Sequence, residues 1–336
     1  MIIKENYSLL AHNTFRLPVK TRWFIEYSNA SDLEKILSDE YFQELPSLHI
    51  GEGSNLLFIN DYGGVVFHSA IKGMEVERET AEEVWLRVGA GERWDDVVAH
   101  TVQQGWGGIE NLSGIPGEAG AAAVQNIGAY GVELKDVVET VEAYAHFTIE
   151  KKCFTAAECA YGYRTSRFKD EMAEPHYITH LTLRLQKNPT FHLDYGSLRT
   201  HLDPTDISLQ SVRSAIQSIR AEKLPDPKVL GNAGSFFMNP TVSKATFEAL
   251  RNINPAIPSY PANDDGVKIP AAWLIEQCGF KGQRYDDVGV YEKQALVLVN
   301  HGDARGHEIA LLAESIRTAV QQRFGVELLT EVKYIG

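Results

Sequence analysis

Hydrophobic and polar residues alternate in short blocks along the whole chain. Blocks with a two-residue period, or short apolar runs, predict strands, and blocks with apolar residues three and four apart predict helices. The two kinds of block interleave without an internal repeat, so we expect an α+β fold. The expected strands are residues 48–50, 84–88, 178–186, 295–299 and 326–335, and the expected helices are residues 31–39, 94–104, 212–219, 270–278 and 309–324.

Local signals indicate where some of these helices begin and end. Ser31 and Glu34 have the spacing of a capping box, which predicts a helix start at this point. Gly105 is expected to end the helix that carries Trp94. Pro270 and Gly279 frame a further helix in the usual order, with proline at the start and glycine just past the end.

The composition is that of an ordinary globular protein. The chain has 336 residues, of which 44% are hydrophobic and 23% charged, and this length suggests two or three domains. The formal net charge is −13, which argues against a nucleic-acid partner because phosphate backbones are bound by basic surfaces. An anionic small molecule is still allowed, since it needs only a locally positive pocket.

The cysteines and the chain start favour a cytoplasmic protein. Cys153, Cys159 and Cys278 contain no CxxC pair, so neither a disulfide framework nor a cysteine-rich zinc site is expected. The first twenty residues lack the apolar core of a signal peptide. No apolar run reaches the ~18 residues of a membrane helix. The histidines, for example His68 and His180, form no HxxxH or HExxH pattern, and we expect no metal.

A first glycine-rich segment follows the expected strand 48–50. Its sequence is Gly51-Glu52-Gly53-Ser54-Asn55, and glycines here would allow backbone amides to approach a phosphate closely. The segment is not a Rossmann fingerprint, because Leu56 stands where a third glycine is required. A plain tight turn is an equally good interpretation of this segment alone.

A second segment, residues 113–131, is more unusual. Its 19 residues contain five glycines and five alanines, so they offer little apolar surface for a core of their own. Small residues suit a backbone that lies flat against a ligand, while close packing between a helix and a strand is the alternative. Two such segments in one chain favour a ligand site.

Together these segments carry a resemblance to a known family. Residues 51–57 and 113–131 look like the FAD-binding half of the UDP-N-acetylenolpyruvoylglucosamine reductases, which make a peptidoglycan precursor, and are similar to the wider vanillyl-alcohol-oxidase-type fold. The Tyr195 segment resembles the subgroup with an extra substrate-covering loop. Met238 departs from the polar or basic residue expected there. The resemblance continues in order through residues 161–169, 194–198, 223–240 and 328–336.

The resemblance implies noncovalent FAD, NADPH as the hydride-donating cosubstrate, and reduction of the enolpyruvyl double bond of UDP-N-acetylglucosamine enolpyruvate to UDP-N-acetylmuramate. Neither glycine-rich segment contains a His or Cys for covalent attachment of the flavin. The implied FAD-binding residues are Gly51, Glu52, Gly53, Ser54, Asn55, Gly114, Ile115, Pro116, Gly117, Ala122, Gln125, Asn126, Ile127, Gly128, Tyr130 and Gly131.

Three residues are implied to carry the chemistry. Arg164 has a planar fork suited to a carboxylate, although a surface arginine is the ordinary interpretation. Ser235 is the implied proton donor to a strongly basic enolate, although serine beside glycine more often stabilises a turn. Glu331 is implied to stabilise the same intermediate with Arg164, although a solvated strand residue is the default.

Five further residues are implied to bind the substrate. Lys223 offers a charge for the diphosphate, and the Tyr195 hydroxyl could cover it. Asn239 offers amide hydrogen bonds. Tyr260 is a weaker candidate for the same anion, and Gln294 is another. Each of these residues is equally compatible with ordinary surface chemistry.

The expected architecture has three parts. Residues 1–70, joined by the C-terminal strand 326–336, form FAD-binding subdomain 1, residues 71–218 form FAD-binding subdomain 2, and residues 219–325 form a smaller substrate-binding domain. We expect a monomeric, cytoplasmic enzyme of cell-wall biogenesis, with no membrane or nucleic-acid partner.

Two other functions stay open at this stage. An oxidase or dehydrogenase with the same flavin fold would act on another substrate. A nucleotide-sugar-binding module would retain the cleft without the chemistry, and the presence of Arg164, Ser235 and Glu331 together argues against it.

Overall fold

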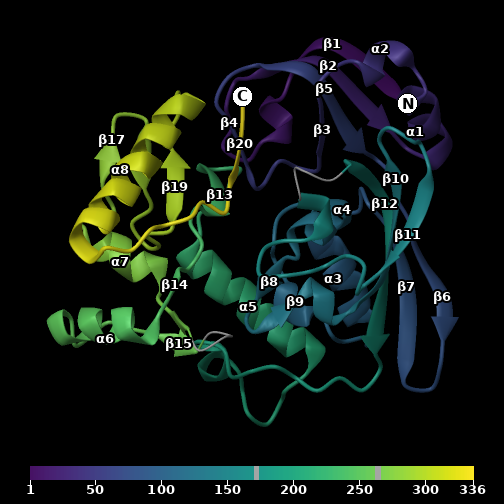
Figure 1. The fold of residues 1–336 in the computed structure, drawn as a ribbon. Helices are drawn as coiled ribbons and strands as arrows, with labels where there is room; N and C mark the ends of the chain where they lie inside the picture. Colours follow the sequence, from purple (N-terminus) through teal and green to yellow (C-terminus); the bar gives the residue numbers. More distant parts are fainter. Residues whose placement is uncertain (170–173, 262–265) are drawn as a thin grey trace. The chain divides into compact units, whose positions relative to one another are not determined.

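The computed structural model describes residues 1–169, 174–261 and 266–336, and its backbone contacts divide the chain into two compact units (Figure 1). Each unit is assembled from separate stretches of chain. Unit 1 contains Met1–Tyr7, Thr21–Glu52 and Gly63–Arg220, and unit 2 contains Ser8–Lys20, Gly53–Tyr62 and Ala221–Gly336. The finer division into three parts stays a prediction.

The first sheet of unit 1 has the strand order β1-β2-β5-β3. Strands β3 and β5 run parallel. Two short helices, α1 and α2, contribute Leu33, Ile36 and Phe42 to a core that they share with β2 and β5. The bounds are β1 Ile2–Ser8, β2 Lys20–Tyr27, β3 Ser47–Ile50, β5 Tyr62–Ser69, α1 Ala30–Leu37 and α2 Glu40–Gln43.

The second sheet of unit 1 is antiparallel, with the order β11-β10-β12-β7-β6. Helices α3 and α4 pack on it, because Val97 and Val98 of α3 and Ala122 of α4 share one buried cluster with apolar residues of the strands. The bounds are β6 Met74–Glu79, β7 Glu83–Gly89, β10 Val138–Ala145, β11 Lys151–Thr155, β12 His176–Gln186, α3 Trp94–Gln103, α4 Ala119–Gln125, α5 Leu209–Lys223 and, as a two-stranded hairpin, β8 Gly128–Ala129 and β9 Val132–Glu133.

Unit 2 is built around a sheet of order β13-β19-β18-β17 and a small sheet of order β14-β16-β15. The long helix α8 buries Ile309, Leu312, Ile316 and Val320 along one face. Strand β20 pairs in parallel with β4. The bounds are β4 Leu56–Phe58, β13 Gly231–Ser235, β14 Thr241–Val242, β15 Tyr260–Pro261, β16 Val267–Lys268, β17 Arg284–Tyr285, β18 Val288–Val290, β19 Val297–Asn300, β20 Lys333–Ile335, α6 Lys244–Ile253, α7 Ala271–Gln277 and α8 Gly306–Phe324.

The α+β class is confirmed, and so are most expected elements, with two corrections. Helix α1 is capped by Asn29, whose Oδ1 accepts from the Asp32 N–H at 2.8 Å, so the cap expected at Ser31 is wrong. The expected strand 326–335 is also too long. Only Lys333–Ile335 forms a regular strand, because the preceding residues bond irregularly to residues 236–238.

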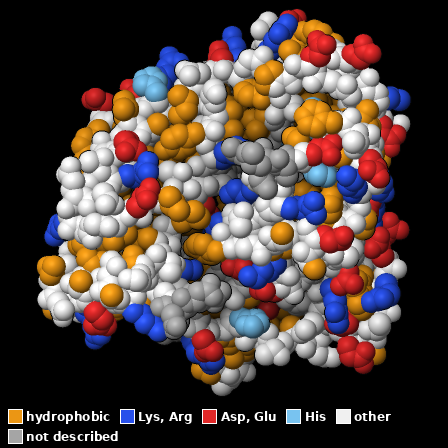
Figure 2. All heavy atoms as spheres, in the orientation of Figure 1, with side chains coloured by type: hydrophobic (Ala, Val, Ile, Leu, Met, Phe, Trp, Pro, Cys, Tyr) orange, Lys and Arg blue, Asp and Glu red, His pale blue; other side chains and the backbone are white. Residues whose placement is uncertain are grey.

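Every helix in the described part of the chain falls short of the length or apolarity that crossing a lipid bilayer requires. On the face drawn in Figure 2, acidic and basic side chains are interspersed.

Candidate active site and cofactor site

Glu52 joins the two glycine-rich segments within unit 1. Its Oε2 accepts a hydrogen bond from the Gly117 N–H at 3.0 Å, and its Oε1 lies 3.1 Å from Nε of Arg93. A Cβ atom at Gly51 would lie 3.1 Å from Oε2 of Glu118. The structure therefore brings these parts of the two predicted FAD segments together.

Gly53 has a local structural reason to be glycine. Its φ is +67°, and a Cβ atom there would lie 2.1 Å from the carbonyl oxygen of His12. A ligand is not needed to explain the missing side chain. Ser54 is half-buried, and Asn55 donates from Nδ2 to the Glu331 carbonyl at 3.1 Å.

The second segment already uses several of its amides internally. The N–H groups of Ala119 and Gly120, at the start of α4, donate to the carbonyls of Glu92 and Ala90 at 2.8 Å each. A Cβ atom at Gly120 would lie 2.9 Å from Cβ of Ala90, so close packing accounts for this glycine. These two amides are not available for a phosphate.

The C-terminal end of α4 presents polar groups with a different character. Oε1 of Gln125 is buried and has no hydrogen-bond partner among the described residues. Asn126 is buried with φ +45° and donates from Nδ2 to the Gly162 carbonyl at 2.8 Å. A buried acceptor without a partner is destabilising, and a flavin ring carries an N–H donor, so this end of the segment fits the predicted cofactor.

The other predicted cofactor residues differ in exposure. Gly117 and Ala122 are buried, Pro116 and Gly131 are exposed, and the half-buried ones are Gly114, Ile115, Ile127, Gly128 and Tyr130.

Arg164 is held in an unusual backbone conformation. Its φ is +57°, a region that a large side chain rarely adopts and that is often found at functional sites. Its Nη2 donates to the Gly128 carbonyl at 2.7 Å, and the guanidinium lies 5.3 Å from the centre of the Tyr163 ring. The structure thus brings Arg164 to the predicted FAD segment.

The predicted covering residue Tyr195 is half exposed and lies beside Tyr130, with ring centres 6.3 Å apart in an edge arrangement. Asn111 supports both segments, because its Nδ2 donates to the Tyr130 and His192 carbonyls at 2.8 Å each. Asn111 was not predicted from the sequence, because only the fold shows that it connects two distant loops.

Arg220 is a second residue at the glycine-rich segments that was not predicted from the sequence. Its Nε donates to the Gly114 carbonyl at 3.1 Å. Burial lowers the pKa of Arg220 from its ordinary value, while Tyr130 and Asp95 oppose this shift. Its place in α5, three residues before Lys223, was the only signal in the sequence. A half-buried guanidinium at the second glycine-rich segment suits an anionic or carbonyl-rich ligand.

Ser235 lies at an irregularity in β13. The register between β13 and β19 shifts between Asn232 and Ser235, and Gly234 has φ +68°. Oδ1 of Asn232 accepts from the Gly234 N–H at 2.9 Å and fixes the turn. Bulges of this kind redirect side chains and are common beside active sites. The Ser235 side chain is half-buried.

Glu331 lies on the segment paired with the residues that follow Ser235. Its N–H donates to the Phe236 carbonyl at 2.8 Å, and Phe237 and Thr330 form an antiparallel bridge. Glu331 is half-buried. Unit 2 therefore presents a hydroxyl and a carboxylate from two adjacent, hydrogen-bonded segments.

The remaining predicted substrate residues also lie in unit 2. Gln294 Oε1 accepts from the Leu296 N–H at 3.3 Å, and Leu296 in turn bonds to Phe236. Asn239 Oδ1 accepts from the Ala271 N–H at 2.9 Å, at the start of α7. Lys223 and Tyr260 are exposed.

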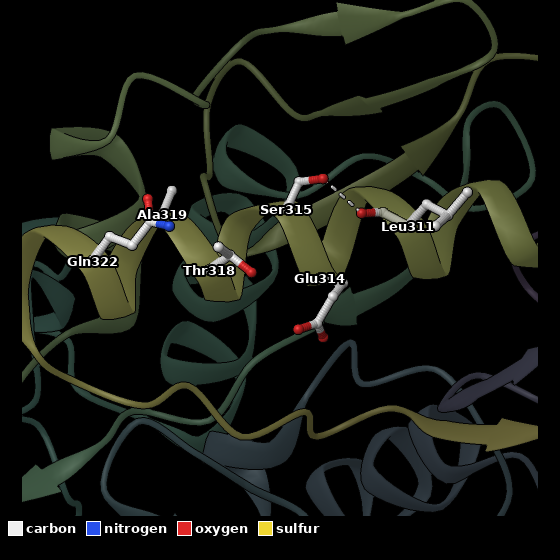
Figure 3. A pocket seen from close by; sticks show the side chains of 6 residues that line it. All are labelled: Leu311, Glu314, Ser315, Thr318, Ala319 and Gln322. Atoms are coloured by element: carbon white, nitrogen blue, oxygen red, sulfur yellow. Dashed lines mark hydrogen bonds between the residues drawn. The ribbon is translucent and has the colours of Figure 1, made fainter.

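A shallow hollow of about 400 Å³ lies elsewhere, on the outer side of α8 (Figure 3). It contains none of the predicted site residues, so the chemistry is not assigned to it. Its lining residues are Leu311, Glu314, Ser315, Thr318, Ala319 and Gln322.

Two family models match the chain. An FAD-binding domain model matches residues 22–146, and a model described as the UDP-N-acetylenolpyruvoylglucosamine reductase C-terminal domain matches residues 226–335. The first match includes both glycine-rich segments. The second includes Ser235 and Glu331.

Several reductases are similar to this chain over its full length. The chain is 48% identical over 337 residues to a UDP-N-acetylenolpyruvoylglucosamine reductase of Porphyromonas gingivalis, with 100% of both chains covered. It is 47% identical to one of Bacteroides fragilis, with 99% and 100% covered. A solved UDP-N-acetylenolpyruvylglucosamine reductase from Thermus caldophilus has a TM-score of 0.71 at 21% identity, with 100% of both chains covered, and shares the fold.

Proposed function

The chain belongs to the family of UDP-N-acetylenolpyruvoylglucosamine reductases, and from this we propose that it reduces the enolpyruvyl double bond of UDP-N-acetylglucosamine enolpyruvate to UDP-N-acetylmuramate, with NADPH as the reductant. It is an FAD-binding oxidoreductase. The observation that carries the proposal is the 48% identity over the full length of the relative. The hydrogen bond from the Glu331 N–H to the carbonyl of Phe236, the residue after Ser235, supports it.

The cofactor would be held mainly by residues of unit 1. When bound there, FAD would supply the chemistry of hydride transfer from NADPH to the terminal alkene carbon of the substrate. The fit rests on the buried, unpartnered Oε1 of Gln125 and on the small residues of α4. We assign FAD contacts to the two glycine-rich segments, with Gly53 and Gly120 serving the fold as well.

Three side chains would act on the substrate. Reduction of the terminal carbon leaves negative charge that spreads into the substrate carboxylate. Arg164 and Glu331 would stabilise that charge with hydrogen bonds from preorganised donors, Glu331 in its protonated form. Ser235 would then donate its hydroxyl proton to the adjacent carbon, and the irregularity in β13 would orient its side chain for this step.

The substrate and cellular assignments complete the proposal. The nucleotide sugar would be bound by Lys223, Tyr195, Asn239, Tyr260 and Gln294. The positive charge of Lys223 would attract its diphosphate. We also propose that the enzyme is monomeric and acts in the cytoplasm in the synthesis of peptidoglycan precursor.

The flavin absorbance of the purified protein tests this function. We expect a yellow protein that NADPH bleaches and that the enolpyruvyl substrate recolours under anaerobic conditions. If oxygen admitted afterwards reoxidises the bleached flavin rapidly and the substrate does not, an oxidase is favoured instead. A protein that stays colourless after incubation with FAD would favour a nucleotide-sugar-binding module.

A further inference from the structure

His68, near the end of β5, lies between two carboxylates inside unit 1. Its Nδ1 is 3.0 Å from Oε2 of Glu26 on β2, and its Nε2 is 3.0 Å from Oε1 of Glu118. The residue is only 9% exposed, and the Phe24 ring stacks against it. Ionised carboxylates only accept hydrogen bonds. Two such contacts therefore require N–H groups on both ring nitrogens, which is the imidazolium form.

Glu118 connects His68 to the glycine-rich segments. It immediately precedes α4, and its second oxygen would lie 3.1 Å from a Cβ atom at Gly51. Next to it, the Gly117 N–H binds Glu52. His68 thus links the first sheet of unit 1 to the place where the two segments meet.

The two carboxylates at this place are neutralised by different kinds of cation. Glu52 pairs with Arg93, and the guanidinium of arginine stays charged at all ordinary pH values. Glu118 pairs with His68, which can lose its proton near neutral pH. FAD carries an anionic diphosphate, and an uncompensated carboxylate in the segments that bind it would repel that group.

We propose that the imidazolium of His68, held between Glu26 and Glu118, is a positioning residue for the FAD-binding segments and makes FAD retention pH-dependent. When His68 loses its proton, Glu118 is left uncompensated and one of the two hydrogen bonds to the ring is lost. The segment then binds the anionic cofactor less tightly. The proposal rests on FAD binding and not on the substrate, so its test is independent of the reductase reaction.

The neighbouring charges set the pH range. Burial by itself would lower the pKa of His68, but the hydrogen bonds with Glu118 and Glu26 outweigh burial and raise the pKa above its ordinary value. Burial lowers the pKa of His49, on the adjacent strand β3, to about 3, so His49 stays neutral.

Glu118 has neighbours of both signs. Burial raises its pKa and Glu52 adds to this shift, while His68 and Lys72 oppose it. The pKa of His68 is raised in the folded protein. The stabilising contribution of its imidazolium is therefore full below the ordinary histidine pKa of about 6.5, and it is lost as the pH rises through the folded value.

Release of FAD from the holoenzyme, followed by flavin fluorescence between pH 6.5 and 9, tests the proposal. We expect the wild-type Kd for FAD to rise about 10-fold over this range as His68 loses its proton. Glu118→Gln should remove the pH dependence, because no charge then needs compensation. His68→Gln should bind FAD weakly at every pH, and the double variant His68→Gln/Glu118→Gln should bind it more tightly than His68→Gln alone.

Arg93→Gln is the matched control. It uncovers Glu52, so it should weaken FAD binding by the same factor at every pH and leave the wild-type slope with pH intact. A wild-type Kd that is constant over the range would overturn the proposal, and so would a Glu118→Gln variant with the wild-type slope. Urea unfolding of the apoprotein measures whether His68 has a purely structural role. If His68→Gln lowers the stability of the apoprotein but leaves the slope of the Kd with pH unchanged, a role of His68 in FAD retention is contradicted.

Discussion

Gly53 and Gly234 have nearly the same backbone conformation in very different surroundings. Their φ values are +67° and +68°. A Cβ atom at Gly53 would lie 2.1 Å from the His12 carbonyl oxygen, whereas at Gly234 no heavy atom of the described residues outside its two chain neighbours lies within 4 Å of that position. Gly53 is therefore explained by close packing against the backbone of His12. Gly234 has open space in front of a bulge that carries Ser235.

This difference separates residues that hold the fold from residues that serve the chemistry. Both glycines occur in segments that the resemblance assigns to the site, so the sequence does not distinguish them. The structure does, because it shows what an added side chain would touch. Changes around Gly53 should act mainly on stability, and changes around Gly234 should act mainly on turnover.

The largest effect is expected at the side chain that the Gly234 bulge presents. Ser235→Ala should leave reduction of FAD by NADPH nearly unchanged, since Ser235 acts only after hydride transfer. Turnover should fall by ~10²–10⁴-fold, the range typical of losing a general acid. Rapid-mixing absorbance of the flavin, first with NADPH and then with reduced enzyme plus substrate, measures the two half-reactions separately.

Arg164 and Glu331 provide the controls for that experiment. They are proposed to act on the same intermediate, so Arg164→Lys and Glu331→Gln should also spare flavin reduction by NADPH. Their effects combined with Ser235→Ala should be less than additive. If Ser235→Ala slows both half-reactions equally, Ser235 shapes the flavin site and is not the proton donor.

The next effect is on stability and belongs to Gly53. Gly53→Ala should lower the free energy of unfolding by about 2–4 kcal/mol, because a left-handed alanine costs about 1–2 kcal/mol and the overlap with His12 forces a backbone shift. Urea denaturation of the apoprotein measures this loss without the flavin. An apoprotein of wild-type stability that no longer binds FAD would show that Gly53 serves the ligand and not the fold.

Much of the fold follows from local patterns in the sequence. Trp94, Val97 and Val98 have helical spacing, and all three are buried in α3. Pro270 and Gly279 frame α7 as expected. The strand expected over residues 326–335 is wrong for most of its length, because residues 329 and 331 bond to residues 238 and 236 across an irregular bridge that no local pattern encodes.

The site is less accessible from sequence for a physical reason. Ser235 and Glu331 were identified by resemblance, and their segments are joined by the hydrogen bond between Phe236 and Glu331, which are about 100 positions apart in the chain. His68 was considered only as a metal ligand and set aside, because its two carboxylates come from β2 and from the start of α4. Arg220 and Asn111 likewise gain their importance from partners that only the folded chain brings near.

The smallest effect on stability is expected at Gly234, and it tests the comparison most directly. Gly234→Ala introduces the left-handed strain of about 1–2 kcal/mol, partly offset because alanine restricts the unfolded chain. A net loss of about 1 kcal/mol is expected, well below the loss for Gly53→Ala. FAD binding should not change.

Turnover of Gly234→Ala should nevertheless fall, by at most ~10²-fold, because a shift of about 1 Å in a reacting group brings a loss of that size. Gly325→Ala is the matched control: Gly325 ends α8 with φ +66° and also has open space around it. The control should lose the same stability and keep wild-type turnover, since it lies at a helix end with no proposed role in the reaction. If both variants keep full turnover, the bulge does not direct Ser235, and open space at a glycine is no guide to chemistry in this protein. If only Gly234→Ala loses turnover, and only in the half-reaction with substrate, the backbone at Gly234 is what directs the Ser235 hydroxyl.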